Sequence, residues 1–431
     1  MKHFYQVLVN TLITNVTTSY LWFALTFWVY LETKSVLATG IIGGVYMLLV
    51  ASLSIVFGTI VDHHKKKQVF IVSSMFTAIA FVIAAVVYLA LLRDNALDIT
   101  NPVFWVFVGV ILIGAIVANI RNIALSTTVT LLVPKDKRAN ANGLVGTVSG
   151  IGFIITSVFS GLSIGLLGMG WTLTIAAVLM IVATIHMFFV AIPEKGIKHD
   201  PELANKKIDI KGSIAAISAV PGLFALLIFS TFNNFIGGVY MALMDPYGLT
   251  LFSVEHWGML FGVAGTGFII GGLIIAKWGL GKNPIKTLLR LVLIMGLLGA
   301  LFTIREWWWL FAAGMWLYMV LIPAIEATEQ TVIQRVVPYK RQGRVFGFAQ
   351  AFESAAAPIT AFVVAPLAEF IIIPYANSDA GRTSLDWLLG QGEARGIALV
   401  FLIAGLIMVV ASLLAFMTKS YRQLSESYKN S

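Results

Sequence analysis

The sequence predicts an all-α membrane protein with twelve spanning helices, and three observations support this prediction. Of the 431 residues, 59% are hydrophobic and only 11% are charged, whereas a soluble globular chain has about 25% charged residues. The apolar residues form long runs near the length of about 20 residues that crosses a bilayer. Most Lys and Arg residues fall in the short segments between these runs. Because backbone groups in hydrocarbon must pair within their own segment, each run is expected to be helical.

Twelve runs are long enough to span. The first is too long for the apolar core of a secretory signal and lacks a small-residue cleavage site, so we expect it to remain as a span. The expected spans are residues 6–31, 37–61, 68–92, 103–133, 142–167, 170–192, 213–244, 253–277, 284–303, 307–334, 344–372 and 395–417.

The distribution of positive charge orients these spans. With the N-terminus placed inside, 23 of the 29 Lys and Arg residues fall in inner segments, five fall in outer segments, and Arg121 lies within a span. Such a bias is typical of loops that stay in the cytoplasm. We therefore expect a multi-pass protein of the cell inner (plasma) membrane with both termini cytoplasmic. The same clustering argues that the net charge of +9 does not serve nucleic-acid binding.

A polar connector divides the chain into two halves of six spans each. Residues 193–212 hold two Pro residues and several charged residues, a composition typical of a surface linker. We therefore expect an N-terminal six-helix bundle at residues 1–192 and a C-terminal six-helix bundle at residues 213–431.

The two halves also share a local motif. Pro134 and Pro338 each follow a Val, precede a basic cluster and stand nine residues before a Gly, at Gly143 and Gly347. The two motifs are 204 residues apart and lie between the fourth and fifth spans of their halves. This pattern indicates internal duplication, which many transporter folds contain.

The loop between spans two and three carries the most specific motif. From Gly58 to Lys67 it reads Gly-Thr-Ile-Val-Asp-His-His-Lys-Lys-Lys. Its Gly58, Asp62, Lys66 and Lys67 resemble the signature loop of the major facilitator superfamily, although positions 63 and 65 depart from it. The resemblance implies that Asp62 contacts the start of span eleven, near Arg344, when the inner side is closed. These five residues are the expected gating motif.

The resemblance covers the whole chain and implies a major facilitator fold of two six-helix bundles. Within the superfamily the chain looks most like the macrolide-efflux type of drug:proton antiporters, on the segments 132–143, 342–347 and 396–399. Span five lacks the Pro of the Gly-Pro motif that such antiporters often carry, which weakens the case for export over import. In the second-half copy of the signature loop, Ala276 takes the acidic position after Gly272.

Ionisable residues inside spans are costly and are therefore candidates for function. Glu326 and Glu329 share one face of span ten, Glu353 lies in span eleven, and Arg121 lies in span four at a depth similar to that of Glu326. Burial favours the neutral form of a carboxyl group, so these residues could exchange protons. Glu326 is expected either to hold a proton at rest or to pair with Arg121. The alternative is a structural role for Arg121 in capping or helix pairing, a solvated Glu329 near the inner interface and a neutral helix-to-helix hydrogen bond at Glu353.

Polar residues within otherwise apolar spans are candidates for a cavity lining. Asn233 and Asn234 precede two glycines in span seven, Asn15 and Tyr20 lie in span one, and Asn119 lies in span four. Hydrogen bonds between helices are the alternative reading of these side chains.

Several classes of chemistry are absent from the sequence. There is no cysteine, no phosphate-binding loop of the Gly-x4-Gly-Lys type, no nucleophile elbow and no metal-ligand cluster. We therefore expect no cofactor, no metal and no use of ATP. The resemblance implies a monomeric carrier in the lipid bilayer that exports a small lipophilic or amphipathic compound by proton-coupled alternating access. A specific exporter of a metabolite such as a siderophore or lipid, a substrate-sensing receptor and a membrane enzyme remain open alternatives.

Overall fold

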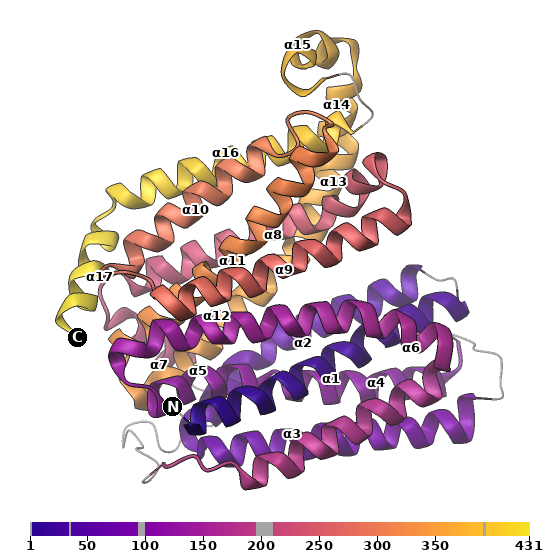
Figure 1. The fold of residues 1–431 in the computed structure, drawn as a ribbon, viewed down its shortest axis with the longest axis vertical. Coiled ribbons are helices and arrows are strands. Elements are labelled where there is room, and N and C mark those ends of the chain that lie inside the picture. Colours follow the sequence, from indigo (N-terminus) through magenta and orange to yellow (C-terminus); the bar gives the residue numbers. More distant parts are fainter. Residues whose placement is uncertain (1, 34–35, 94–99, 195–209, 391–393) are drawn as a thin grey trace. The chain divides into compact units, whose positions relative to one another are not determined.

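The computed structural model describes residues 2–33, 36–93, 100–194, 210–390 and 394–431. All regular secondary structure in these ranges is helical, and they contain no strand (Figure 1). The prediction of an all-α protein is confirmed. Most of the expected linker, residues 195–209, lies outside the described residues.

The first half of the chain begins with five helices and ends in one very long helix. These elements are α1 (Lys2–Thr33), α2 (Val36–His63), α3 (Lys66–Val87) with its π-helical continuation η1 (Tyr88–Leu92), α4 (Pro102–Ala118), α5 (Ile120–Leu132), the 3-10 turn η2 (Lys135–Lys137) and α6 (Arg138–Phe189).

The second half contains short helices before its first span, between its last two spans and after its last span. Its elements are α7 (Ile210–Ser218), α8 (Leu223–Leu251), α9 (Val254–Trp278), α10 (Pro284–Leu301), α11 (Trp308–Val336), the 3-10 turn η4 (Tyr339–Arg341), α12 (Gln342–Ile359), η5 (Thr360–Val364), α13 (Ala365–Leu367), η6 (Ala368–Ile372), α14 (Ile373–Asn377), α15 (Asp379–Leu389), α16 (Arg395–Met417) and α17 (Lys419–Asn430).

Nine helical segments in the described ranges are long and apolar enough to cross a membrane. One of them contains the whole of α6, which holds two expected spans joined at Gly168. Gly168 has a φ of 75°, a left-handed conformation that glycine adopts without strain. Counting α6 as two helices and adding α1 and the helical stretch 342–372 gives the twelve spans that the sequence predicts.

Span seven begins later than the sequence predicts. The expected start at residue 213 falls in the separate short helix α7, and α8 begins only at Leu223. Pro221 and Gly222 cause the break. Proline has no N–H to donate, and Gly222 has a φ of 82°, where a side chain would also collide with the backbone of Ser420.

The chain folds into two compact units whose ranges interleave. Unit 1 holds Met1–Lys135, Ile151–Ile214 and Pro338–Ala351, and unit 2 holds Asp136–Gly150, Ala215–Val337 and Phe352–Ser431. The two exchanged segments start at the paired Val-Pro motifs, one of them at Pro338 and the other two residues after Pro134. At both motifs a helix ends, a 3-10 turn follows, and a long helix begins. The expected division at one linker therefore holds for most of each half. However, Asp136–Gly150 packs with unit 2, and Pro338–Ala351 packs with unit 1.

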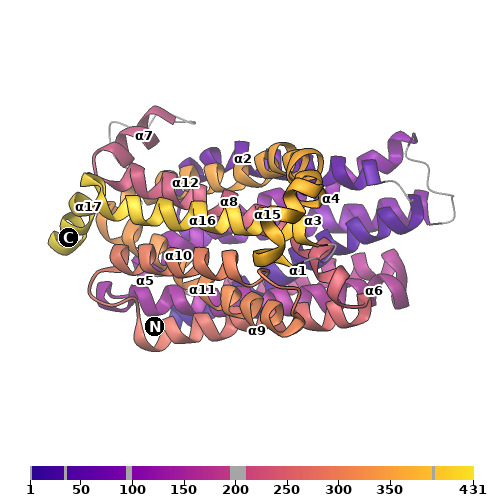
Figure 2. The same cartoon turned by 90° about the horizontal axis from the view of Figure 1, so that it is seen from above.

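Each unit is built from helices that pack along most of their length. In unit 1, α3 packs on α4; in unit 2, α10 packs on α16 and α9 on α11 (Figures 1 and 2). Large apolar side chains such as Leu166 and Phe189 remain exposed on the outer faces of helices. In a membrane protein such faces contact lipid.

The short helix α15 lies between the last two expected spans. Arg305 donates to the carbonyls of Asp386 and Trp387 at the C-terminal end of α15, at 3.2 and 2.5 Å. Arg395 forms an ion pair with the Asp386 carboxylate. A cation at a helix C-terminus satisfies carbonyls that lack partners in the helix. These contacts tie α15 to Arg305 and Arg395 within unit 2.

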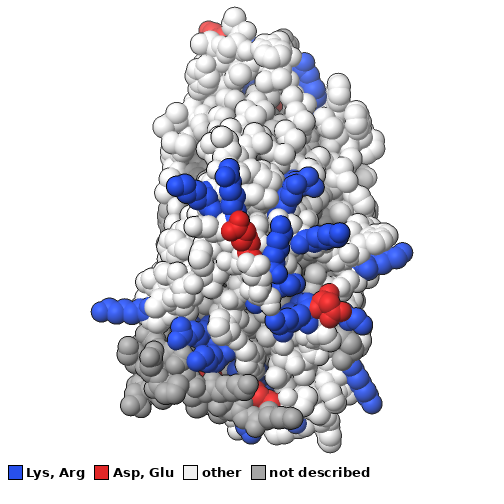
Figure 3. Space-filling view, turned by 90° about the vertical axis from the view of Figure 1, so that its left-hand side faces the viewer, with Lys and Arg blue, Asp and Glu red and all other residues white. Residues whose placement is uncertain are grey.

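On the face drawn in Figure 3, Lys and Arg side chains far outnumber Asp and Glu side chains. In each unit we call the corresponding end, where the spans meet their Lys- and Arg-rich turns, the basic end.

Candidate functional site

Asp62, in the last turn of α2, caps the beginning of α12 within unit 1. Its carboxylate oxygens accept hydrogen bonds from the backbone N–H of Gly343 at 2.7 Å and of Arg344 at 3.0 Å. These N–H groups belong to the first turn of a helix, where no intrahelical acceptor exists and a negative charge is favoured. We call this arrangement the Asp62 cap. It brings together three residues of the expected gating motif, since Gly58 lies one turn before Asp62.

Three glycines let α2 and α12 approach closely enough for the cap to form. A Cβ atom at Gly58 would collide with the carbonyl oxygen of Gly343 and lie 3.1 Å from the Cα of Gly347. A Cβ atom at Gly347 would lie 2.8 Å from the Cα of Gly58. The glycine of the motif is therefore a requirement of helix packing.

We expect Gly58→Ala to destabilise the protein, because the new methyl group must push α12 away from α2. Overpacking of this kind costs about 1–3 kcal/mol. Thermal unfolding in detergent should show a lower transition temperature for Gly58→Ala. Gly44→Ala is the matched control in the same helix, because no atom lies within 4 Å of a Cβ atom there. Equal transition temperatures for the two variants would contradict the packing role of Gly58.

A second group of contacts stabilises the same end of unit 1, and the sequence analysis missed it. Glu194 accepts from the backbone N–H of Lys66 at 2.8 Å and from the Tyr339 hydroxyl at 2.8 Å, and it pairs with the Lys66 ammonium at 3.7 Å. Burial, with the carboxylate of Glu194 beside it, raises the pKa of Tyr339. Glu194 was expected to mark an exposed linker. Its side chain is instead buried at 6% exposure, because it joins the start of α3 to η4.

The basic residues of the motif serve different partners. Lys66 is buried, donates to the carbonyls of Val61 and His64, and lies 5.2 Å from the centre of the Tyr339 ring. Lys67 donates to the carbonyl of Phe188 at 2.9 Å. The motif thus closes the α2–α3 loop onto the ends of α6 and η4.

The second-half copy of the motif packs in the same way but without a charge. Gly143 in α6 lies so close to Gly272 and Ala276 in α9 that no side chain would fit at Gly143. Where the first copy has an acid, the Asn140 amide donates to the Ala276 carbonyl at 2.9 Å. Unit 2 therefore has a neutral counterpart of the Asp62 cap.

Arg121 is completely buried inside unit 1. Its guanidinium donates to the Phe70 carbonyl at 3.0 Å, to the Ser74 hydroxyl and to the Asn10 side chain, and it stacks 4.8 Å from the Phe70 ring. Asn10 in turn donates to the Ala183 carbonyl at 2.6 Å. Pairing with Glu326 was one of two expected arrangements. In the structure the guanidinium has no exposed surface, and its contacts join α1, α3 and α5, which favours the structural alternative for Arg121.

The three carboxyl groups of unit 2 differ in exposure. Glu326 is exposed although its neighbours Ile325 and Ala327 are buried, Glu353 is partly exposed, and Glu329 is buried. An exposed charged residue in the middle of a span faces water rather than lipid, because hydrocarbon penalises it by several kcal/mol. The sequence predicts that Glu326 lies deep within its span. Its side chain points away from the packed face of α11.

Glu329 and Glu353 are close enough to interact directly. A hydrogen bond links their side chains. Glu326 lies within electrostatic range of Glu329, and Glu353 lies within electrostatic range of Glu326. A hydrogen bond between two carboxyl groups requires a proton on one of them. The group formed by these three residues can therefore bind and release a proton.

The amide residues expected to line a cavity are not equivalent. Asn234 is exposed, while Asn15, Asn119 and Asn233 are partly exposed. The Asn233 side-chain oxygen has no hydrogen-bond partner. Tyr20 does not fit the expectation, because its ring is buried and its hydroxyl bonds to Ser163 inside unit 1.

Asn119 belongs to a partly exposed aromatic cluster that the sequence analysis did not identify. Its amide donates to the Tyr46 hydroxyl at 3.0 Å, and the Tyr46 ring stacks on Trp22 at 4.3 Å between centroids. Asn119 also stands at the break between α4 and α5. A flat aromatic surface with an adjacent amide can hold an apolar ring and orient a polar group.

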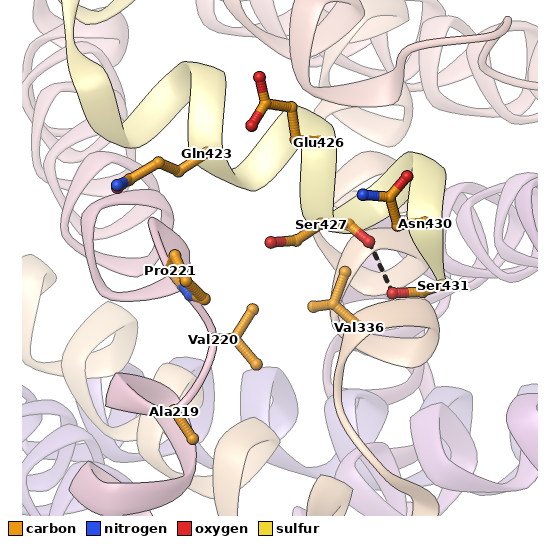
Figure 4. A pocket seen from close by; sticks show the side chains of 9 residues that line it. All are labelled: Ala219, Val220, Pro221, Val336, Gln423, Glu426, Ser427, Asn430 and Ser431. Carbon is orange, nitrogen blue, oxygen red and sulfur yellow. Dashed lines mark hydrogen bonds between the residues drawn. The ribbon is translucent and has the colours of Figure 1, made fainter.

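A cavity of about 450 Å³ lies elsewhere in unit 2, between the α7–α8 turn, the end of α11 and α17 (Figure 4). Val336 from α11 and Glu426 from α17 are among the residues that line it. Val336 is ten residues from Glu326, which is roughly 15 Å along the helix. The cavity therefore does not include Glu326.

One family model and several known proteins match this chain. The family model described as Major Facilitator Superfamily matches residues 7–361. Macrolide efflux protein A of Streptococcus pyogenes is 23% identical over 381 residues, which is 85% of this chain and 90% of that protein. Macrolide efflux protein A of Enterococcus faecalis is 23% identical over 315 residues, which is 70% of this chain and 92% of that protein.

Two solved structures share the fold. A bacterial homologue of the iron transporter ferroportin in an outward-facing state superposes with a TM-score of 0.70 at 15% identity, covering 97% of this chain and 100% of that one. The proton:xylose symporter XylE gives a TM-score of 0.66 at 14% identity, covering 99% of both chains. These identities establish a common fold only.

Proposed function

The chain belongs to the Major Facilitator Superfamily, and from that membership we propose that it exports a small amphipathic organic compound in exchange for protons. It is a membrane transporter rather than an enzyme. The names of its macrolide-efflux relatives support export of a drug-like compound. We further propose that the basic end of each unit is cytoplasmic and that the protein acts as a monomer in the cell inner membrane.

The exposed carboxyl group of Glu326 is the observation that carries the proton part of the proposal. It lies in the middle of a span, beside the hydrogen-bonded Glu329 and Glu353. A proton can drive a conformational change only if it binds the two conformations with different affinity. In our proposal Glu326 takes up a proton when its surroundings hydrate from outside and releases it inside, with Glu329 and Glu353 as the next sites.

The substrate part of the proposal rests on mixed apolar and amide surfaces. Unit 1 combines the stacked rings of Trp22 and Tyr46 with the amide of Asn119. Unit 2 contributes the amides of Asn233 and Asn234. Ligand pockets commonly consist of an apolar lining with a few polar groups. We propose that these residues contact an amphipathic substrate.

The Asp62 cap gives the cycle a gate in this proposal. Capping α12 stabilises the conformation in which α2 and α12 are in contact, and separating them exposes two N–H groups and a carboxylate. We propose that this separation accompanies opening toward the cytoplasm. Arg121 then serves as a fixed structural centre of unit 1, because its bonds hold three helices together.

Efflux of a fluorescent amphipathic drug tests the proposal. We expect cells that express the protein to lose the drug faster than cells without it, and the difference to vanish when a protonophore collapses the proton gradient. Counterflow in proteoliposomes should persist without a gradient. Efflux that survives collapse of the proton gradient would refute proton coupling, and absence of counterflow for a panel of amphipathic drugs would refute the substrate class.

A further inference from the structure

The turn between α9 and α10 carries an uncompensated patch of positive charge. Lys277, Lys282, Lys286 and Arg290 are all exposed, and the sequence from 277 to 290 contains no acidic residue. We call these four residues the α9–α10 basic patch. None of them forms an ion pair with any residue that the structure describes.

The patch lies at the edge of the hydrocarbon. One candidate span ends at Trp278 and the next begins at Pro284, so only five residues form the turn. The Trp278 ring is 69% exposed, and the Lys277 ammonium lies 4.8 Å from its centre. Exposed tryptophans typically mark the headgroup region of a bilayer.

The exposed stripe of α10 shows what this surface faces. Lys286 and Arg290 begin the stripe, and it continues along the same face with apolar residues that are 43–48% exposed, namely Ile294, Leu297 and Leu301. Such an apolar stripe contacts acyl chains. Arg290 lies six residues after Pro284, roughly 9 Å along the helix, so its guanidinium must extend back toward the interface to find a polar partner. A soluble protein partner would not reach it there.

In the corresponding loop of the first half, charged side chains bind other parts of the protein. Asp62 caps α12, and Lys66 pairs with Glu194. In the second copy Ala276 replaces the acid, so nothing in the loop balances its cations. Lys286 and Arg290 stand at i and i+4, where like charges destabilise a helix. An anion between them would remove that repulsion.

We propose that the α9–α10 basic patch binds the headgroup of an anionic phospholipid in the leaflet at the basic end. The phosphate lies between Lys286 and Arg290, Lys282 contacts the headgroup from the turn, and the acyl chains lie along Ile294, Leu297 and Leu301. In this proposal the second-half copy of the motif, which lacks the acid, binds lipid. The first-half copy, which has Asp62, caps α12.

Purified protein in nanodiscs tests this proposal. Thermal stability is measured in phosphatidylcholine alone and in phosphatidylcholine that contains phosphatidylglycerol, and bound phosphatidylglycerol is titrated by native mass spectrometry. Each cation near a membrane surface contributes roughly a fivefold factor in affinity. We expect K282Q/K286Q/R290Q to bind phosphatidylglycerol at least about tenfold more weakly and to lose the stabilisation specific to that lipid.

Two comparisons make the result decisive. K419Q/R422Q/K429Q removes three exposed cations from α17 and should keep wild-type affinity, so an equal loss in this variant would reduce the effect to net charge and overturn the proposal. Inorganic phosphate should not reproduce the stabilisation, and a matching shift with phosphate would show an anion site instead of a lipid site. Stability in phosphatidylcholine alone reports whether each variant folds.

Discussion

Glu326→Gln should abolish uphill efflux while leaving part of the downhill exchange. The amide keeps the shape of the side chain but fixes a neutral form, so the group can no longer change its charge during the cycle. Because Glu326 is exposed and its neighbours along α11 are buried, the substitution should not disturb packing. Drug efflux against a gradient and counterflow at equal pH on both sides measure the two activities separately.

The same change at Glu426 provides the control for Glu326→Gln. Glu426 is an exposed carboxylate on α17, outside the spans, so Glu426→Gln should retain uphill efflux. Wild-type uphill transport and an unchanged pH profile in Glu326→Gln would refute its role in coupling. Glu353 would then be the leading candidate, because it is partly exposed and bonded to Glu329.

Asp62→Asn should slow transport strongly and leave substrate affinity nearly unchanged. The two oxygens of Asp62 accept from two N–H donors, whereas an asparagine amide offers one oxygen and turns an NH₂ group toward the second donor. Hydrogen bonds to charged groups contribute about 1.5–3 kcal/mol, so the capped conformation should lose at least roughly tenfold in population relative to the uncapped one. Transport rate in proteoliposomes and equilibrium drug binding measure the two effects.

The absence of cysteine from the chain gives Asp62→Asn a direct structural readout. A single cysteine introduced at Ser54, which packs against Gly347, should react faster with a thiol reagent when the cap is lost. The control is Asp136→Asn, which changes an exposed acid in the turn η2. It should change neither the transport rate nor the thiol reactivity of the introduced cysteine. A tenfold loss of drug affinity with normal exchange would show that Asp62 belongs to the binding site and not to the gate.

The sequence alone determined the membrane fold and the contact partner of Asp62. Runs of about 20 apolar residues can satisfy their backbone in lipid only as helices, so composition and loop charge defined the spans. The break at Gly168 and the paired Val-Pro turns followed from local chemistry. The resemblance of the Gly58–Lys67 loop placed Asp62 at the start of α12, and the hydrogen bonds to Gly343 and Arg344 are formed there.

Only the tertiary structure decided which polar residues are exposed and which are buried between packed helices. In lipid a span can be apolar on all sides, so its sequence does not indicate which face is buried. The sequence predicts similar depths for Arg121 and Glu326. In the structure Arg121 is enclosed by Asn10, Phe70 and Ser74, while Glu326 is exposed.

The contacts of Glu194 likewise could not be predicted from the local sequence. Lys66 and Tyr339 lie 128 and 145 residues away from it, and the exchange of Asp136–Gly150 and Pro338–Ala351 between the units depends on how whole helices pack. Local sequence specifies helices and turns because their hydrogen bonds are local. It does not specify these long-range pairs, which form only when several helices have packed together.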